Sequence, residues 1–235
     1  MEKYFKVMRN YILFGLLFSL FGACSTHTTE FYGGNRYLCF DNENGADTAF
    51  VSFSNYPGAL SHEVAFRVVL TGELAETDLE YRLEAVDSLT TADLTDYELP
   101  EHLFFRQGKT EDTLMITVKN ENPVLTDRSL QVVFRIVANE NFMPGLAGRQ
   151  EVKITFNNKK SKPEWWKGDL QKLILGEYSP KKMEHFIICT GVNNLEGVEL
   201  SVARAYTLQF KRYCVNNGLT EEDGVTPMVD GIPCY

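Results

Sequence analysis

The chain has 235 residues, 32 of them acidic and 23 Lys or Arg, and its formal charge is −9. Because the chain is acidic and has no basic stripe, we expect no nucleic-acid partner. Without the N-terminal segment described next, about 210 residues remain, enough for one large domain or two small ones with buried cores.

Residues 1–23 have the three parts of an export signal. A basic start, an apolar run and two small residues follow one another: Lys3, Lys6 and Arg9, then 11–21, then Gly22 and Ala23. The apolar run is too short to span a bilayer as a stable helix, so we expect it to be cleaved. Removing it shifts the formal charge from −9 to −11, because the three basic residues are opposed only by Glu2.

A cysteine, Cys24, stands where the cut should fall. The segment resembles a bacterial lipoprotein signal, in which the Cys24 sulfur receives a diacylglycerol and the new amino terminus receives an acyl chain such as palmitate. Several acyl chains would anchor the protein stably to a membrane. The alternative is an ordinary secretory signal with Cys24 as a bystander, since Phe21 stands where the motif prefers Leu.

Residues 24–36 are predicted to be a lipidated polar tether. Ser25 is not the aspartate that in some bacteria retains a lipoprotein at the inner membrane, so we expect the outer membrane of the cell envelope. Periplasmic and surface display both stay open.

Residues 37–157 are predicted to form one domain, and from 49 to 156 the pattern alternates with the period of two that is typical of strands. About seven runs are separated by turn-forming segments: 49–54, 62–71, 79–85, 103–105, 114–118, 130–136 and 152–156. This pattern predicts a mainly β protein with a β-sandwich.

Residues 158–235 are predicted to form a smaller helical or α+β region, beginning after a polar basic stretch that ends in Pro163. Ser179 and Pro180 supply a helix start and Gly191 a stop. A second helix is predicted over 199–216, with Ala203, Tyr206, Phe210 and Tyr213 on one face. We expect the helices to pack on each other and either on the sandwich or on residues near Trp165, and 220–235 to be loop.

Two families resemble this chain. The segment 87–97, with the turn at 107–110, resembles the hallmark of Calx-beta modules, which are Ig-like sandwiches. More of the chain resembles the lipoprotein family called domain of unknown function 4843, through Tyr37–Phe40, Asp47-Thr48, Thr71-Gly72, Thr91–Tyr97, Asn139–Phe142, Lys162-Pro163, Trp165-Trp166, Leu175–Ser179 and Lys181-Lys182. This resemblance implies a setting of polysaccharide capture and uptake, without a mechanism.

Calcium is the first candidate ligand, because some Calx-beta modules bind it through acidic loops and Ca²⁺ needs several oxygens. The candidate ligands are Asp87, Asp93, Asp96 and Glu121. The alternative gives Asp96 the role of a turn cap and expects no cofactor, because 119–122 holds one carboxylate where calcium-binding members have an acidic run.

Trp165 and Trp166, with Tyr178, are the candidate glycan-binding residues, because flat aromatic faces stack on sugar rings. Adjacent residues of a strand point to opposite faces, so at most one tryptophan should be a platform while the other is core. The alternative places both in the core.

The sequence gives little support for catalysis, since it has no nucleophile elbow, zinc-protease motif, phosphate loop or dinucleotide fingerprint. His185 and Cys189 lie four residues apart in a predicted helix, but apolar neighbours favour a buried thiol there. We therefore expect no enzymatic activity.

Disulfides are an open alternative, because an exported protein can be oxidised. Cys189 with Cys214 would join the two predicted helices, Cys214 with Cys234 would fix the tail, and free thiols are the other option.

Two functions follow from these patterns. The first is a non-catalytic outer-membrane lipoprotein that binds a glycan or a partner beside polysaccharide-uptake proteins. The second is a structural, adhesion or assembly subunit whose exposed strands pair with another chain and which has no sugar affinity.

Overall fold

The computed structural model describes residues 34–234. The predicted signal, the lipidation site Cys24 and the tether up to residue 33 lie outside these residues and stay predictions. The chain divides into two units, 1–34 and 35–235, and every element named below belongs to the second. In this described part, no helix combines the length and the apolar character needed to cross a membrane.

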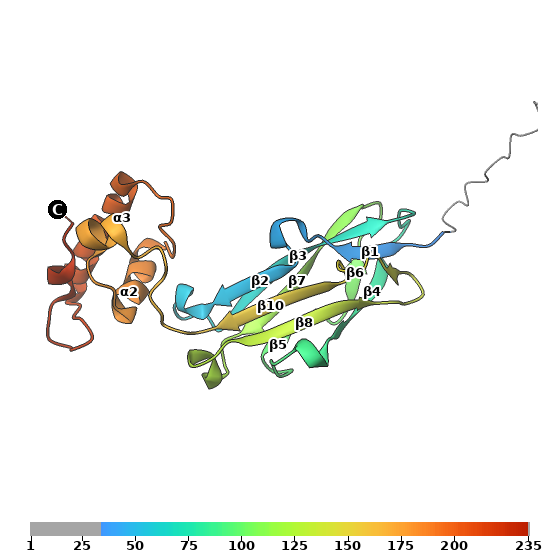
Figure 1. Cartoon of the computed structure of the whole chain (residues 1–235), viewed down its shortest axis with the longest axis horizontal. Coiled ribbons are helices and arrows are strands. Elements are labelled where there is room, and N and C mark those ends of the chain that lie inside the picture. Colours follow the sequence, from blue (N-terminus) through green and yellow to red (C-terminus); the bar gives the residue numbers. More distant parts are fainter. Residues whose placement is uncertain (1–33, 235) are drawn as a thin grey trace, which may run out of the picture. The chain divides into compact units, whose positions relative to one another are not determined.

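Two five-stranded sheets face each other in the sandwich (Figure 1). One sheet has the order β5-β7-β3-β1-β9 and the other β2-β10-β8-β4-β6. The strands are β1 (Tyr37–Phe40), β2 (Thr48–Ser52), β3 (Ser61–Thr71), β4 (Leu79–Ala85), β5 (Tyr97–Glu98), β6 (Leu103–Phe105), β7 (Glu111–Lys119), β8 (Leu130–Val137), β9 (Met143–Pro144) and β10 (Glu151–Asn157). The mainly β sandwich predicted from the sequence is confirmed.

The sandwich core comes from the alternating residues of the long strands. Phe66 of β3 lies opposite Leu114 of β7, and both are buried, while Arg67, the next residue of β3, is exposed. In the other sheet Phe134 of β8 is paired with Val152 of β10, again both buried. These residues belong to one continuous hydrophobic cluster, which is what period-two alternation predicts for two sheets packed face to face.

The prediction of about seven strands missed three short ones. β5 and β9 have two residues each and β1 has four, so none is long enough to show a period of two. β1 nevertheless lies inside its sheet, antiparallel to β3 and parallel to β9. Short 3-10 turns connect several strands: η1 (Glu43–Gly45), η2 (Phe53–Asn55), η3 (Asp87–Leu89) and η4 (Pro123–Thr126).

The first C-terminal α-helix, α2 (Pro180–Thr190), has the predicted boundaries. The Ser179 hydroxyl accepts a hydrogen bond from the Lys182 backbone N–H, Pro180 occupies the first turn, and Gly191 ends the helix in the left-handed conformation. The sequence did not reveal the π-helix η5 (Leu170–Leu175) that precedes it.

The second helix, α3 (Leu200–Asn217), buries a slightly different face from the predicted one. Ala203 and Phe210 are buried as expected, but Thr207 and Cys214 complete the buried face, and Tyr206 and Tyr213 are only partly buried against it. Both helices share a second core with Trp166, as predicted for residues near Trp165.

The tail was predicted to be loop, and it is instead a packed segment. Its 3-10 turn η6 (Met228–Gly231) follows a β-bridge between Thr220 and Pro227. Met228 and Cys234 are fully buried in the second core. A tail rich in Gly and Pro can therefore contribute core residues without forming a long helix.

The tail is tied to α2 by a buried lysine. Lys182 is 2% exposed, and its Nζ donates to the Glu177 carbonyl at 2.8 Å and pairs with Glu221 Oε1 at 2.9 Å. The Ser179 hydroxyl donates to the other Glu221 oxygen at 3.1 Å. These bonds compensate the burial of the ammonium group and hold residues 220–222 beside the start of α2.

Candidate functional site

A pocket of about 420 Å³ lies between the end of β2 and η2 on one side and residues 159–165 and 193–194 on the other. We call it the junction pocket, and its lining is Phe50, Ser52, Ser54, Asn55, Tyr56, Asn157, Lys159, Ser161, Pro163, Trp165, Asn193 and Asn194. A few aromatic rings among many amides and hydroxyls are the lining that a sugar requires, because sugar rings have apolar faces and polar edges.

Three aromatic side chains line the junction pocket. Phe50 is 64% exposed, while Trp165 and Tyr56 are half-buried. Trp165 packs against Trp166, with ring centroids 5.4 Å apart, and Tyr56 packs against His62 at 4.3 Å. Since each of these two rings is supported from behind by another ring, its orientation is held before any ligand arrives.

The polar side chains of the pocket are linked to one another. Ser52 Oγ donates to Asn157 Oδ1 at 3.2 Å and lies 2.8 Å from Ser54 Oγ. The Asn193 amide donates to the Asn55 carbonyl at 3.5 Å. These bonds position hydroxyl and amide groups at the pocket wall, where they can exchange hydrogen bonds with ligand hydroxyls.

Trp166 does not contribute a surface. It is fully buried, and its indole N–H donates to the Gly176 carbonyl at 2.9 Å. Trp166 therefore belongs to the second core, whereas Trp165 lines the pocket. The role of Trp165 as a glycan platform stays a prediction. The pair lies in a turn rather than in the strand that the expectation assumed.

Tyr178 lies in a separate, smaller pocket of about 140 Å³. Its ring meets Trp166 edge to face, with centroids 5.4 Å apart. Burial, and secondarily the charge of Glu222, raises the pKa of Tyr178. The two pockets share Ser54, Asn55, Ser161 and Pro163, so they adjoin each other.

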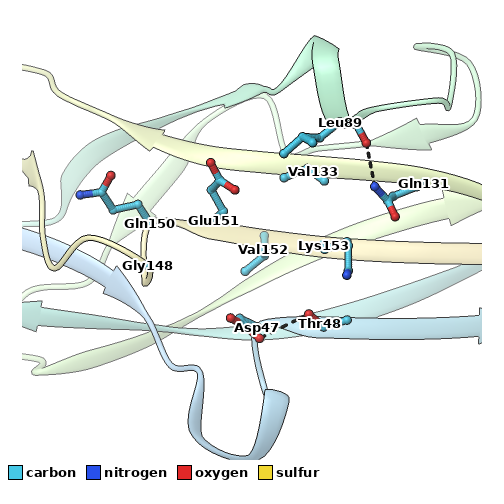
Figure 2. A pocket seen from close by; sticks show the side chains of 10 residues that line it. All are labelled: Asp47, Thr48, Leu89, Gln131, Val133, Gly148, Gln150, Glu151, Val152 and Lys153. Carbon is cyan, nitrogen blue, oxygen red and sulfur yellow. Dashed lines mark hydrogen bonds between the residues drawn. The ribbon is translucent and has the colours of Figure 1, made fainter.

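A shallow groove of about 480 Å³ lies over β2, β10 and β8 (Figure 2). Figure 2 shows the Gln131 amide donating to the Leu89 carbonyl, at 2.8 Å. Gln150 donates to the Gly145 carbonyl, and Glu151 pairs with Arg135. Because its polar groups are largely engaged and no aromatic ring lines it, this groove fits a sugar less well than the junction pocket does.

The acidic residues proposed as calcium ligands are not gathered into a cluster. In residues 34–234 there is no group of three or more His, Cys, Asp or Glu side chains that could hold a metal ion. Asp96 accepts hydrogen bonds from the Asp93 backbone N–H at 2.8 Å and from the Asn122 amide at 3.1 Å. Asp96 thus caps a turn, which is the alternative role expected from the sequence. Asp87 begins η3, and Glu121 follows the end of β7.

Within residues 34–234, Cys39, Cys189, Cys214 and Cys234 are free thiols. Burial raises the pKa of Cys214 to about 11, with a further contribution from Cys189, and burial also raises the pKa of Cys189. The structure joins neither proposed pair, Cys189 with Cys214 or Cys214 with Cys234, by a disulfide.

His185 and Cys189 do not form an activated pair on the described geometry. His185 packs near the Tyr213 ring, with centroids 6.3 Å apart, and its Nδ1 is buried without a hydrogen-bond partner among the described residues. A thiol with a raised pKa is a poor nucleophile at neutral pH because little thiolate forms.

Sequence reasoning missed most of the junction pocket. Phe50 stood in a predicted strand and Tyr56 in a predicted turn, and neither position carries a motif. The sequence holds no signal that could have found them, because the exposure of Phe50 and the proximity of Tyr56 to Trp165 arise only in the fold.

The chain belongs to the family Domain of unknown function (DUF4843), whose model matches residues 31–192. The match includes the sandwich, η5 and α2, and therefore almost every residue of the junction pocket. No curated protein matches the sequence.

Solved structures with similar sandwiches have low sequence identity to this chain. A two-domain protein of unknown function from Bacteroides fragilis is 12% identical, with a TM-score of 0.41 over 54% of this chain and 46% of its own. The CBD12 region of CALX1.2 is 18% identical, with a TM-score of 0.37 over 52% and 44%. A proposed carbohydrate-binding protein from Bacteroides ovatus is 11% identical, with a TM-score of 0.38 over 52% and 37%. The chain thus spans less than half the length of these structures.

Proposed function

We propose that this protein is a non-catalytic glycan-binding lipoprotein of the outer membrane, acting as an accessory component beside polysaccharide-uptake proteins. Cys24, at the end of an export signal, supplies the proposed anchor. The junction pocket supplies the proposed binding site, with Trp165 and Tyr56 as supported aromatic platforms.

The observation that carries this proposal is the chemistry of the junction pocket. Aromatic rings lie beside several amides and hydroxyls, while no aspartate, glutamate or histidine of the described part of the chain lines the pocket. Glycoside hydrolysis usually requires two carboxyl groups at the scissile bond, so this lining favours binding over cleavage.

The test is retention of the mature chain, begun at Ser25 to omit the lipid, on a panel of plant, host and microbial polysaccharides. We expect saturable retention of the unmodified chain on at least one polysaccharide, without release of sugar. Trp165→Ala should abolish retention, and Lys153→Gln, in the groove of Figure 2, is the matched control that should preserve it. Release of reducing ends would contradict the non-catalytic role.

The competing function is an assembly subunit, and one observation favours it. β2 is the outermost strand of its sheet, and it presents Phe50 to solvent. An outermost strand can pair with a strand of another chain. This function predicts a stable oligomer, detected by light scattering, or a partner protein that co-purifies with the chain. It also predicts no retention on any polysaccharide.

A further inference from the structure

The junction pocket contains one charged side chain, Lys159. Lys159 is half-buried, and its backbone N–H donates to Asn157 Oδ1 at 3.2 Å, which fixes the start of its side chain beside the pocket wall. Among the residues that line this pocket, Lys159 is the charged group with which an anionic ligand could pair.

The neighbouring lysines have partners, and Lys159 does not. Lys160 pairs with Glu184 at 2.9 Å, and Lys162 donates to Gln171 at 2.8 Å. Within residues 34–234, the Lys159 ammonium group makes no hydrogen bond or ion pair, and no carboxylate lines its pocket. The Lys159 ammonium group is therefore available to pair with an anionic group of a ligand, and such a charge-assisted hydrogen bond is stronger than one between neutral groups.

Building on the proposed glycan-binding role, we infer that the junction pocket selects acidic glycans, in which a pyranose ring carries a carboxylate or a sulfate. The ring stacks on Trp165 or Tyr56, its hydroxyls bond to the asparagine and serine side chains, and its anionic group pairs with Lys159. A charge-assisted hydrogen bond in a half-buried pocket is stronger than the same bond to a neutral hydroxyl, so the acidic sugar is preferred.

The experiment measures the affinity of the mature chain for matched polysaccharides that differ in charge. Polygalacturonate is compared with its full methyl ester, and κ-carrageenan with the same polymer after chemical desulfation, so that the carboxylate and the sulfate are tested separately. We expect the acidic member of at least one pair to bind about tenfold more tightly. Lys159→Gln should reduce this preference to none, Lys159→Arg should largely restore it, and the control Lys153→Gln should leave it unchanged.

Three results would overturn the inference, and they are distinguishable from failure of the proposed function. If the protein binds the charged and the uncharged polysaccharide of each pair with equal affinity, the preference for acidic glycans is contradicted, but the protein is still a glycan-binding protein. A preference that persists in Lys159→Gln, with folding checked by circular dichroism, removes the role of Lys159. Binding to no polysaccharide in this or the wider panel contradicts the glycan-binding function as well.

Discussion

Trp165 and Trp166 stack with their ring centroids 5.4 Å apart and their planes inclined by 33°. The inner ring, Trp166, is fully buried in the C-terminal core, and the outer ring, Trp165, lines the junction pocket. The stability of the core and the geometry of the proposed platform are therefore coupled through one pair of consecutive residues.

Trp166→Ala should destabilise the fold by about 3–5 kcal/mol, because it opens a large cavity and removes the indole hydrogen bond to Gly176. Trp165→Ala should cost about 1 kcal/mol or less, since its ring is half-buried. Urea unfolding at 25 °C compares the two variants. Equal losses of stability would contradict the assignment of one ring to the core and the other to the pocket.

Gly176→Ala should cost at least about 2 kcal/mol. Gly176 has a φ of 78°, and a β-carbon there would clash with the Gly231 carbonyl oxygen, so the contact between the end of η5 and the tail would have to open. Gly197 has a similar φ of 70° but open space around it, and Gly197→Ala is the matched control, expected to cost about 1 kcal/mol. Thermal unfolding of both variants measures the difference.

Acid should weaken the bond between Asp112 and Arg106. Burial alone would raise the pKa of Asp112, but hydrogen bonds from the Arg106 side chain and from two backbone N–H groups bring that pKa below its ordinary value of 3.8. The ionised carboxylate therefore stabilises the fold above about pH 4, and this contribution is lost as the pH falls through the lowered pKa.

Asp112→Asn, which removes the charge, should destabilise the fold by about 2 kcal/mol at pH 7. The difference in unfolding free energy between the unmodified chain and this variant should shrink as the pH drops from 4 to 2. The exposed Glu76 provides the control, and Glu76→Gln should have almost no effect. A difference that stays constant with pH would show that charge is not what Asp112 contributes.

The thiols of the native protein should react slowly. Burial raises the pKa of Cys214 to about 11 and also raises that of Cys189, so little thiolate is present at pH 8. Iodoacetamide should modify the native mature chain slowly, and mass spectrometry after unfolding without reductant should find Cys39, Cys189, Cys214 and Cys234 all alkylated. If only two of the four cysteines were alkylated, the other two would be joined by a disulfide, which would contradict the free thiols.

The sequence predicted those parts of the fold in which a local pattern repeats. Alternation over five to ten residues identified β3, β7 and β8, and the caps Ser179 and Gly191 located α2. Strands of two residues, such as β5 and β9, and the π-helix η5 have no such repeat and depend on tertiary contacts.

The candidate site was only partly predictable for the same reason. Trp165 and Trp166 were visible as a rare pair, but the side chains opposite Trp165 come from residues 50–56 and 193–194, far away in the sequence. Their proximity follows from how β2 and η2 lie against the segment after β10, which no spacing rule encodes. The role proposed for Lys159 was likewise not predictable, because the sequence does not show that Lys160 pairs with Glu184 and Lys162 with Gln171.

The most direct test of the account is a calorimetric titration of the mature chain and of its Trp165→Ala variant. The titrant is the polysaccharide of the panel that retains the mature chain. The account predicts saturable binding by the unmodified chain and at least about tenfold weaker binding by the folded variant. Equal affinities of the two proteins would contradict the junction pocket as the binding site.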